Sequence, residues 1–128
     1  MEGILDELAG EEGGGCRHVI IPADATIAVE KVRDYLLVPL KANDKSGYLA
    51  LAGYRGEDYW ELIRDIRRQL LPADATFQYR NKFGDFFMAR GVLQGPNGRR
   101  LAVRTIWMKD TDEHFRFITL RPDKREQL

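Results

Sequence analysis

The spacing of apolar residues changes at Pro72 from a helical period to a strand period. Before Pro72, apolar side chains recur every three or four residues, whereas after it they alternate in short runs separated by turn residues. One element cannot serve both periods, so helices and strands must occupy different parts of the chain. This order predicts an α+β fold in which N-terminal helices pack on a four-stranded antiparallel meander sheet.

Three helices are expected before Pro72: the first over residues 28–37, the second from after Asp44 or Ser46 to Gly53, and the third over residues 57–70. In the third, an apolar stripe is preceded by acidic residues and followed by basic ones, which suits the helix dipole. Gly53 is suited to a left-handed cap. A brief β-like run, His18 to Ile21, is ended by Pro22 and is not assigned to the sheet.

Four strands are expected after Pro72, over residues 75–82, 85–94, 99–108 and 115–120. The strongest turn signal is the run from Gly95 to Gly98, between two segments rich in β-forming residues. In the strand that follows, Trp107 shares one face with Leu101, Val103 and Thr105. We therefore expect Trp107 to be buried.

One pentapeptide occurs twice, as residues 22–26 and 72–76, both reading Pro-Ala-Asp-Ala-Thr. The ten residues that follow the two copies do not match. This argues against duplication and predicts that both copies form turns.

Residues 1–15 are expected to form a flexible acidic and glycine-rich tail, and residues 16–128 a single domain. Within the tail, Ile4, Leu5 and Leu8 have helical spacing, so a short helix could dock on the body or on a partner.

The composition favours a globular protein of the bacterial cytoplasm. No apolar run approaches the roughly twenty residues needed to cross a bilayer, and the single cysteine, Cys16, cannot form an internal disulfide. Net charge is zero, but residues 1–64 carry seven Lys and Arg against twelve Asp and Glu, and residues 65–128 carry thirteen against eight. This polarity indicates either a basic face for an anionic partner such as RNA or two halves that attract each other.

The sequence predicts neither a metal site nor a cofactor. The two histidines, His18 and His114, lie far apart along the chain, and zinc needs several such ligands. Asp110, Asp112 and Glu113 could chelate a hard cation, but they lie in an expected hairpin turn with no loop glycine at calcium-site spacing, which favours a solvated turn.

A set of polar residues has chemistry that suits phosphate, because arginine binds two phosphate oxygens and histidine titrates near neutrality. The proposed catalytic residues are Arg104, His114, Arg116 and Thr119, with Lys41 and Lys45 as substrate-binding residues. The alternative is that the arginines are exposed sheet residues paired with acids and that His114 is a turn residue.

The order of short motifs from Ile21 to Pro122 resembles an uncharacterised family of small bacterial proteins that also occurs as the last domain of polymorphic toxins. The motifs are Pro22 with Ala25, residues 31–37 (KVRDYLL), Lys45 ahead of Gly53-Tyr54, Phe83-Gly84, Gly98-Arg99-Arg100, residues 103–107 (VRTIW), and residues 116–119 (RFIT) ahead of Pro122. The family often has a histidine in the stretch that here spans residues 40–45, and this chain has none.

The family is similar in layout to barnase/EndoU/RelE-like toxin ribonucleases. The resemblance implies a toxin-like domain that binds RNA or cleaves it without metal. One alternative is a non-enzymatic protein-binding module, such as an immunity factor or adaptor, and another is a fold of this kind that has lost its activity. The expected partners are RNA or a cognate antitoxin or immunity protein, and not a membrane.

Overall fold

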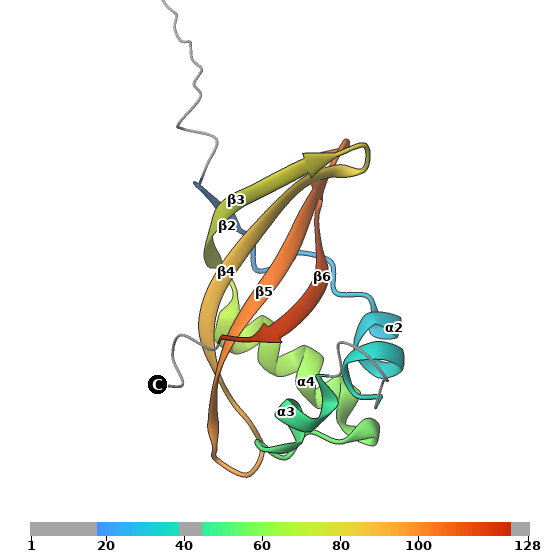
Figure 1. Cartoon of the computed structure of the whole chain (residues 1–128), viewed down its shortest axis with the longest axis vertical. Coiled ribbons are helices and arrows are strands. Elements are labelled where there is room, and N and C mark those ends of the chain that lie inside the picture. Colours follow the sequence, from blue (N-terminus) through green and yellow to red (C-terminus); the bar gives the residue numbers. More distant parts are fainter. Residues whose placement is uncertain (1–17, 39–44, 124–128) are drawn as a thin grey trace, which may run out of the picture.

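The computed structural model describes residues 18–38 and 45–123. Its centre is a five-stranded antiparallel sheet with the strand order β2-β3-β4-β5-β6 (Figure 1). The strands are β2 (His18–Ile21), β3 (Ala73–Asn81), β4 (Gly84–Gln94), β5 (Arg100–Asp110) and β6 (Phe115–Pro122). The expected α+β class is confirmed.

The prediction of a four-stranded sheet preceded only by helices is wrong in one respect. The brief run from His18 to Ile21 joins the sheet as edge strand β2, with Ile21 opposite Ala73 and His18 opposite Thr76. The sequence signal was present, but a four-residue strand becomes stable only by pairing with a longer one.

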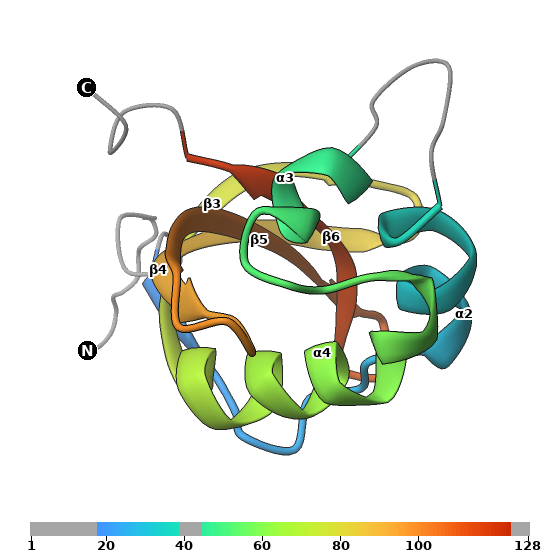
Figure 2. The same ribbon diagram turned by 90° about the horizontal axis from the view of Figure 1, so that it is seen from below.

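The helices lie at the positions expected from the apolar periodicity. They are α2 (Val29–Lys31) with the π-helical continuation η2 (Val32–Leu36), α3 (Ser46–Ala50), and a third segment formed by η3 (Gly56–Asp58), α4 (Tyr59–Asp65) and η4 (Ile66–Leu70). Gly53 has φ +97°, as its predicted role as a left-handed cap requires. Figures 1 and 2 show α2, α3 and α4 gathered on one side of the curved sheet.

The core lies between this sheet face and the helices. Along β5, Leu101, Val103, Thr105 and Trp107 are buried, and the residues between them are partly exposed. Trp107 is fully buried, as predicted, and its Nε1 donates to Thr105 Oγ1 at 2.8 Å.

The β4–β5 hairpin is held against the helices by specific contacts. The Gln69 amide donates to Gln94 O at 2.9 Å and accepts from Gln94 N at 2.7 Å. Gly95 sits directly against Ala52, just after α3, because a Cβ at position 95 would overlap Ala52 O. These contacts place the end of the hairpin against the α3 end of the helical layer.

The free edge of β6 begins with a short bridge to the segment before α2. Thr26 N donates to Phe115 O at 2.9 Å, and Phe117 N donates to Thr26 O at 2.8 Å. The described residues share one hydrophobic core. The predicted tail, residues 1–15, lies outside the described ranges.

Candidate functional site

The face of the sheet that points away from α2, α3 and α4 is not covered by these helices (Figures 1 and 2). We call it the open face. Strand alternation assigns to it the residues between the core positions, including Met88, Arg90, Val92, Arg104 and Ile106. Arg90 and Val92 are exposed and the other three are partly exposed, so a ligand can reach them.

Three arginines form a row across the open face, which we call the arginine row. Arg90, Arg104 and Arg121 are direct register partners on β4, β5 and β6. Adjacent strands are about 4.8 Å apart, so the row spans about 10 Å of backbone. Three like charges in direct register repel one another, which favours a bound anion.

Arg90, at one end of the arginine row, and Arg104, at its centre, differ in how they are paired. Arg90 Nε lies 3.1 Å from Asp123 Oδ2, and Asp123 is 1% exposed. Arg104 Nε is also buried, and it has no hydrogen-bond partner. A buried donor without a partner costs free energy, so the Nε of Arg104 is a donor whose hydrogen-bonding capacity is unused.

His114 and Arg116 lie at the opposite end of β6, around the β5–β6 turn. Asp110 Oδ1 accepts from the backbone N of Asp112 at 2.9 Å and of His114 at 3.0 Å, and Asp110 Oδ2 accepts from Arg116 Nε at 2.9 Å. The His114 backbone N–H, followed by the Arg116 guanidinium, holds the pKa of Asp110 below its ordinary value.

The same turn contains the one cluster of metal-ligand types found in the described residues. Ligand atoms of Asp110, Asp112 and His114 lie within 4.8 Å of one another. Both Asp110 oxygens already accept hydrogen bonds, one of them from a cation. The geometry is explained by the turn itself, since an Asp side chain that caps nearby backbone N–H groups is a common turn device.

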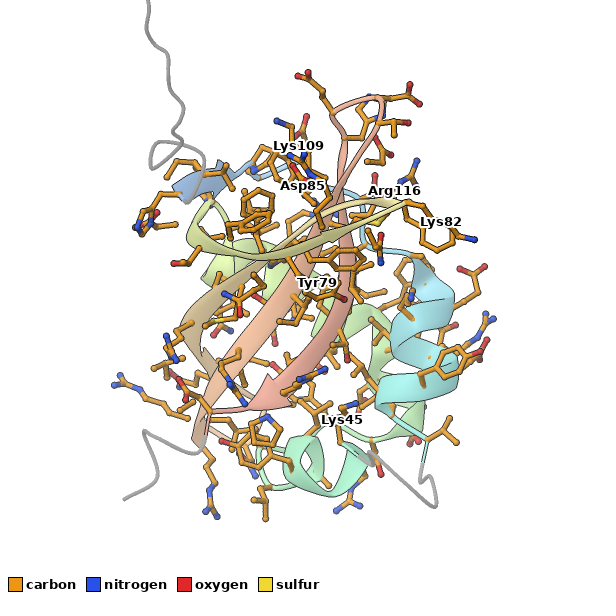
Figure 3. The ribbon with its side chains drawn as sticks, turned by 45° about the horizontal axis from the view of Figure 1, so that its top comes forward. Lys45, Tyr79, Lys82, Asp85, Lys109 and Arg116 are labelled. Atoms are coloured by element: carbon orange, nitrogen blue, oxygen red, sulfur yellow. The ribbon has the colours of Figure 1, made fainter. Side chains whose placement is uncertain are left out.

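A pocket of about 290 Å³ lies beside this turn, where it meets the β3–β4 turn. We call this end of the sheet the tip. The charged residues that line the pocket are Arg80, Lys82 and Lys109 with Asp85, Asp110 and Glu113. Figure 3 shows Lys82, Asp85 and Lys109 at the same end of the molecule as Arg116. Opposite charges are balanced in this pocket, so it has no strong preference for an anion or a cation.

The predicted site residues fall into separate groups. Arg104 lies in the arginine row and Thr119 lies in the neighbouring row, opposite Ile106, while Arg116 pairs with Met108 near the tip. Arg104 and Met108 are four residues apart on β5, or about 13 Å. His114 lies still farther along, in the turn.

Lys45 lies at the other end of the sheet. It precedes α3, whose Tyr48 hydroxyl donates to Ala102 O at 2.7 Å, and Ala102 is six residues, or about 20 Å, from Met108. Figure 3 shows the resulting separation of Lys45 from Arg116. The five predicted residues that the structure describes therefore do not surround one phosphate, because successive strand residues advance by more than 3 Å. Lys41 lies outside the described residues.

Sequence reasoning missed Arg90, Arg121 and the exposed aromatic Tyr79. Arg90 lies opposite Arg104 because Gln94 pairs with Arg100, whereas a loop limited to residues 95–98 would have put Arg90 opposite Val103. Arg121 was missed because the last strand was ended at Leu120. Tyr79 is 52% exposed and stacks on Phe86 at a centroid distance of 4.6 Å.

The fold and this surface define a small α+β domain with an uncovered, arginine-bearing sheet face. A family model described as Domain of unknown function (DUF6883) matches residues 22–124, and the chain belongs to this family. No curated protein and no solved structure matches the chain. Among the described helices, none is both long and apolar enough to cross a membrane.

Proposed function

We propose that the open face binds the backbone of single-stranded RNA, with phosphates on the arginine row. The observation that supports this most directly is the central guanidinium of Arg104, whose buried Nε has no hydrogen-bond partner between two further arginines. Arginine presents several donors in a rigid fork that matches phosphate oxygens, and contacts of this kind dominate binding to nucleic-acid backbones.

The aromatic pair near the tip extends the same surface. Phe86 covers one ring face of Tyr79, and the other part of the Tyr79 side chain is accessible to solvent. A base can stack on such a ring irrespective of its identity. This arrangement favours sequence-tolerant recognition of a single strand, in which bases are free to stack, over recognition of a duplex.

The fuller form of the proposal is a toxin-like, metal-independent ribonuclease. His114 is exposed and lies two residues from Arg116. In that role His114 removes the proton of a ribose 2′-hydroxyl as the oxygen attacks phosphorus, and the bond from phosphorus to the 5′-oxygen breaks to leave a 2′,3′-cyclic phosphate. Solvent water protonates the leaving 5′-oxygen, and the guanidinium of Arg116 stabilises the charge on the phosphate oxygens. The arginine row then holds the strand at a second phosphate about 13 Å or more away.

RNA binding is tested by fluorescence anisotropy with a labelled single-stranded 12-mer in EDTA, over a range of NaCl concentrations. Each phosphate contact contributes about 0.7 to the slope of log K against log salt for a single strand, so three contacts give a slope of about −2. Arg104→Gln should reduce the magnitude of this salt slope by about 0.7. Arg68→Gln, an exposed arginine on η4, is the matched control and should leave the slope unchanged.

Cleavage is tested separately on the same RNA, because binding does not require a proton-transfer group. His114→Ala should lower the cleavage rate at least a hundredfold without changing the salt slope. Binding without cleavage by the unchanged protein would support a domain that has lost activity. Absence of binding at low salt would overturn the proposal.

The alternative of a protein-binding module has its own candidate surface on the helical side. Trp60 is 61% exposed on α4, and its ring centroid lies 5.5 Å from that of Tyr59. Exposed aromatic residues are enriched where proteins meet. A cognate partner whose binding is lost in Trp60→Ala and kept in Arg104→Gln would favour this alternative.

A further inference from the structure

The chain that leads into the sheet carries charge opposite to that of the open face. Residues 1–16 contain five carboxylates and no Lys or Arg; the acids are Glu2, Asp6, Glu7, Glu11 and Glu12. The open face carries Arg90, Arg100, Arg104, Arg116 and Arg121 against Asp74, Asp110 and Asp123. Two of these acids are already paired, Asp110 with Arg116 and Asp123 with Arg90.

The point of attachment puts these carboxylates within reach of the arginine row. His18 begins β2 and lies in the same row of the open face as Thr76, Met88 and Ile106. From β2 to Arg104 on β5 is three strand spacings, or about 14 Å, and the five residues 13–17 can span about 17 Å when extended. Three of those five residues are glycine, which can adopt the reversal of direction that such a path needs.

We propose that residues 1–12 dock on the open face of their own chain as an acidic cover over the arginine row. Carboxylates of this segment take the place of phosphates, because both present two oxygens to a guanidinium. Apolar contacts accompany the charges. Val92 and Ile20 are 52% and 60% exposed on the open face, and Ile4, Leu5 and Leu8 have the spacing of one helix face.

The consequence for RNA rests on the proposed function, since the cover and the RNA compete for the same arginines. If the cover occupies the face in nine molecules of ten, the apparent affinity for RNA is tenfold weaker than that of the uncovered face. The cover therefore makes RNA binding depend on whatever removes it, such as competing cations or a partner that captures the acidic segment.

Docking is measured without RNA, by paramagnetic relaxation enhancement in the full chain. A nitroxide is attached at Gly3→Cys in a Cys16→Ser background, and the amide signals of Val92, Ala102 and Ile106 are monitored. We expect broadening at these positions at low salt and its loss in 1 M NaCl. Loss is also expected when all five acids are changed to their amides, or when Arg104→Gln is introduced; Arg68→Gln should have no effect.

The outcomes separate the possible occupants. Absence of broadening on the open face, or broadening confined to residues around Trp60, would overturn the inference. So would broadening of an isotope-labelled copy by a nitroxide on a separate copy, because that result would identify a second molecule as the occupant.

The RNA experiment separates this inference from the proposed function. The five-amide variant should bind the 12-mer about tenfold more tightly than the unchanged chain at low salt. Broadening without RNA binding by either protein would overturn the proposed function and leave the docked segment standing. RNA binding of equal affinity by the two proteins, with no broadening, would overturn the docked segment and leave the proposed function standing.

Discussion

Removing the hydroxyl of Tyr54 should destabilise the fold by an amount that depends on pH. Tyr54 is fully buried, and its hydroxyl donates to Asp65 Oδ2 at 2.6 Å and to Gln94 O at 3.3 Å. In Tyr54→Phe, the buried Asp65 carboxylate loses this donor. Leaving a buried acceptor without its partner costs about 1–3 kcal/mol, so we expect a loss of roughly 2 kcal/mol at neutral pH.

The pH dependence follows from the state of the same hydroxyl. Burial, and then the hydrogen bond to Asp65, raise the pKa of Tyr54 well above its ordinary value of 10.0. The folded chain therefore keeps this proton at a pH where the unfolded chain has lost it, and stability contributed by Tyr54 falls as pH rises above about 10. The fall approaches about 1.4 kcal/mol per pH unit.

The measurement is urea denaturation of the wild-type chain and Tyr54→Phe at pH 7, 9 and 11. The stability difference between them should shrink by about 1.4 kcal/mol from pH 9 to pH 11, because phenylalanine has no proton to lose. Tyr35→Phe is the control, since Tyr35 is 60% exposed. A difference that stays constant across this range would refute the placement of the Tyr54 hydroxyl against Asp65.

Three further predictions concern packing and the β5–β6 turn. Trp107→Ala should cost about 3–5 kcal/mol in urea denaturation, because the indole is fully buried, and an equally stable variant would contradict its position. Gly95→Ala should cost about 1–3 kcal/mol, since its new Cβ would overlap Ala52 O, whereas Gly47→Ala, at an exposed position of α3, should be neutral or stabilising; the reverse order would be inconsistent with the hairpin contact. The pKa of Asp110, followed by carboxyl-carbon NMR, should lie below its ordinary value and rise in Arg116→Gln, so that stability from this pair is present above about pH 4 and is lost as pH falls through the lowered pKa; an unchanged pKa would exclude the ion pair.

The sequence predicted most of the fold because apolar spacing decides which elements can cover a common core. The third helix and the turn from Gly95 to Gly98 were located closely, as was the left-handed cap at Gly53. Edge strand β2 was left out of the sheet, since a four-residue strand has little local signal and gains its stability from β3.

The repeated pentapeptide shows why local sequence is not sufficient. In the first copy, Ala25 N donates to Pro22 O at 3.1 Å and the backbone turns, whereas in the second copy Ala73 to Thr76 extend as the start of β3. Both were predicted as turns, and the second prediction is wrong. Identical side chains give different backbones here because residues 73–76 have a partner strand to pair with.

The candidate site was predicted less well than the fold, because a site depends on register as well as on residue type. Arg104 and Thr119 were placed correctly on a common sheet, but neighbours along one strand are separated by more than 3 Å per residue, so Arg116 and His114 lie in a different region. The register of β5 with β6 places Arg121 opposite Arg104, and no pattern within β6 alone indicates this position.

The bridge from Thr26 to β6 also affects how the molecule behaves in a crowded solution. An unpaired strand edge can template the addition of another chain, which leads to polymers. Because Thr26 occupies the backbone groups of Phe115 and Phe117, the first part of this edge cannot recruit a neighbour. Proline at position 26, which lacks the N–H that bonds Phe115, would free that edge and should convert a stable solution of the protein into one that forms fibres on storage.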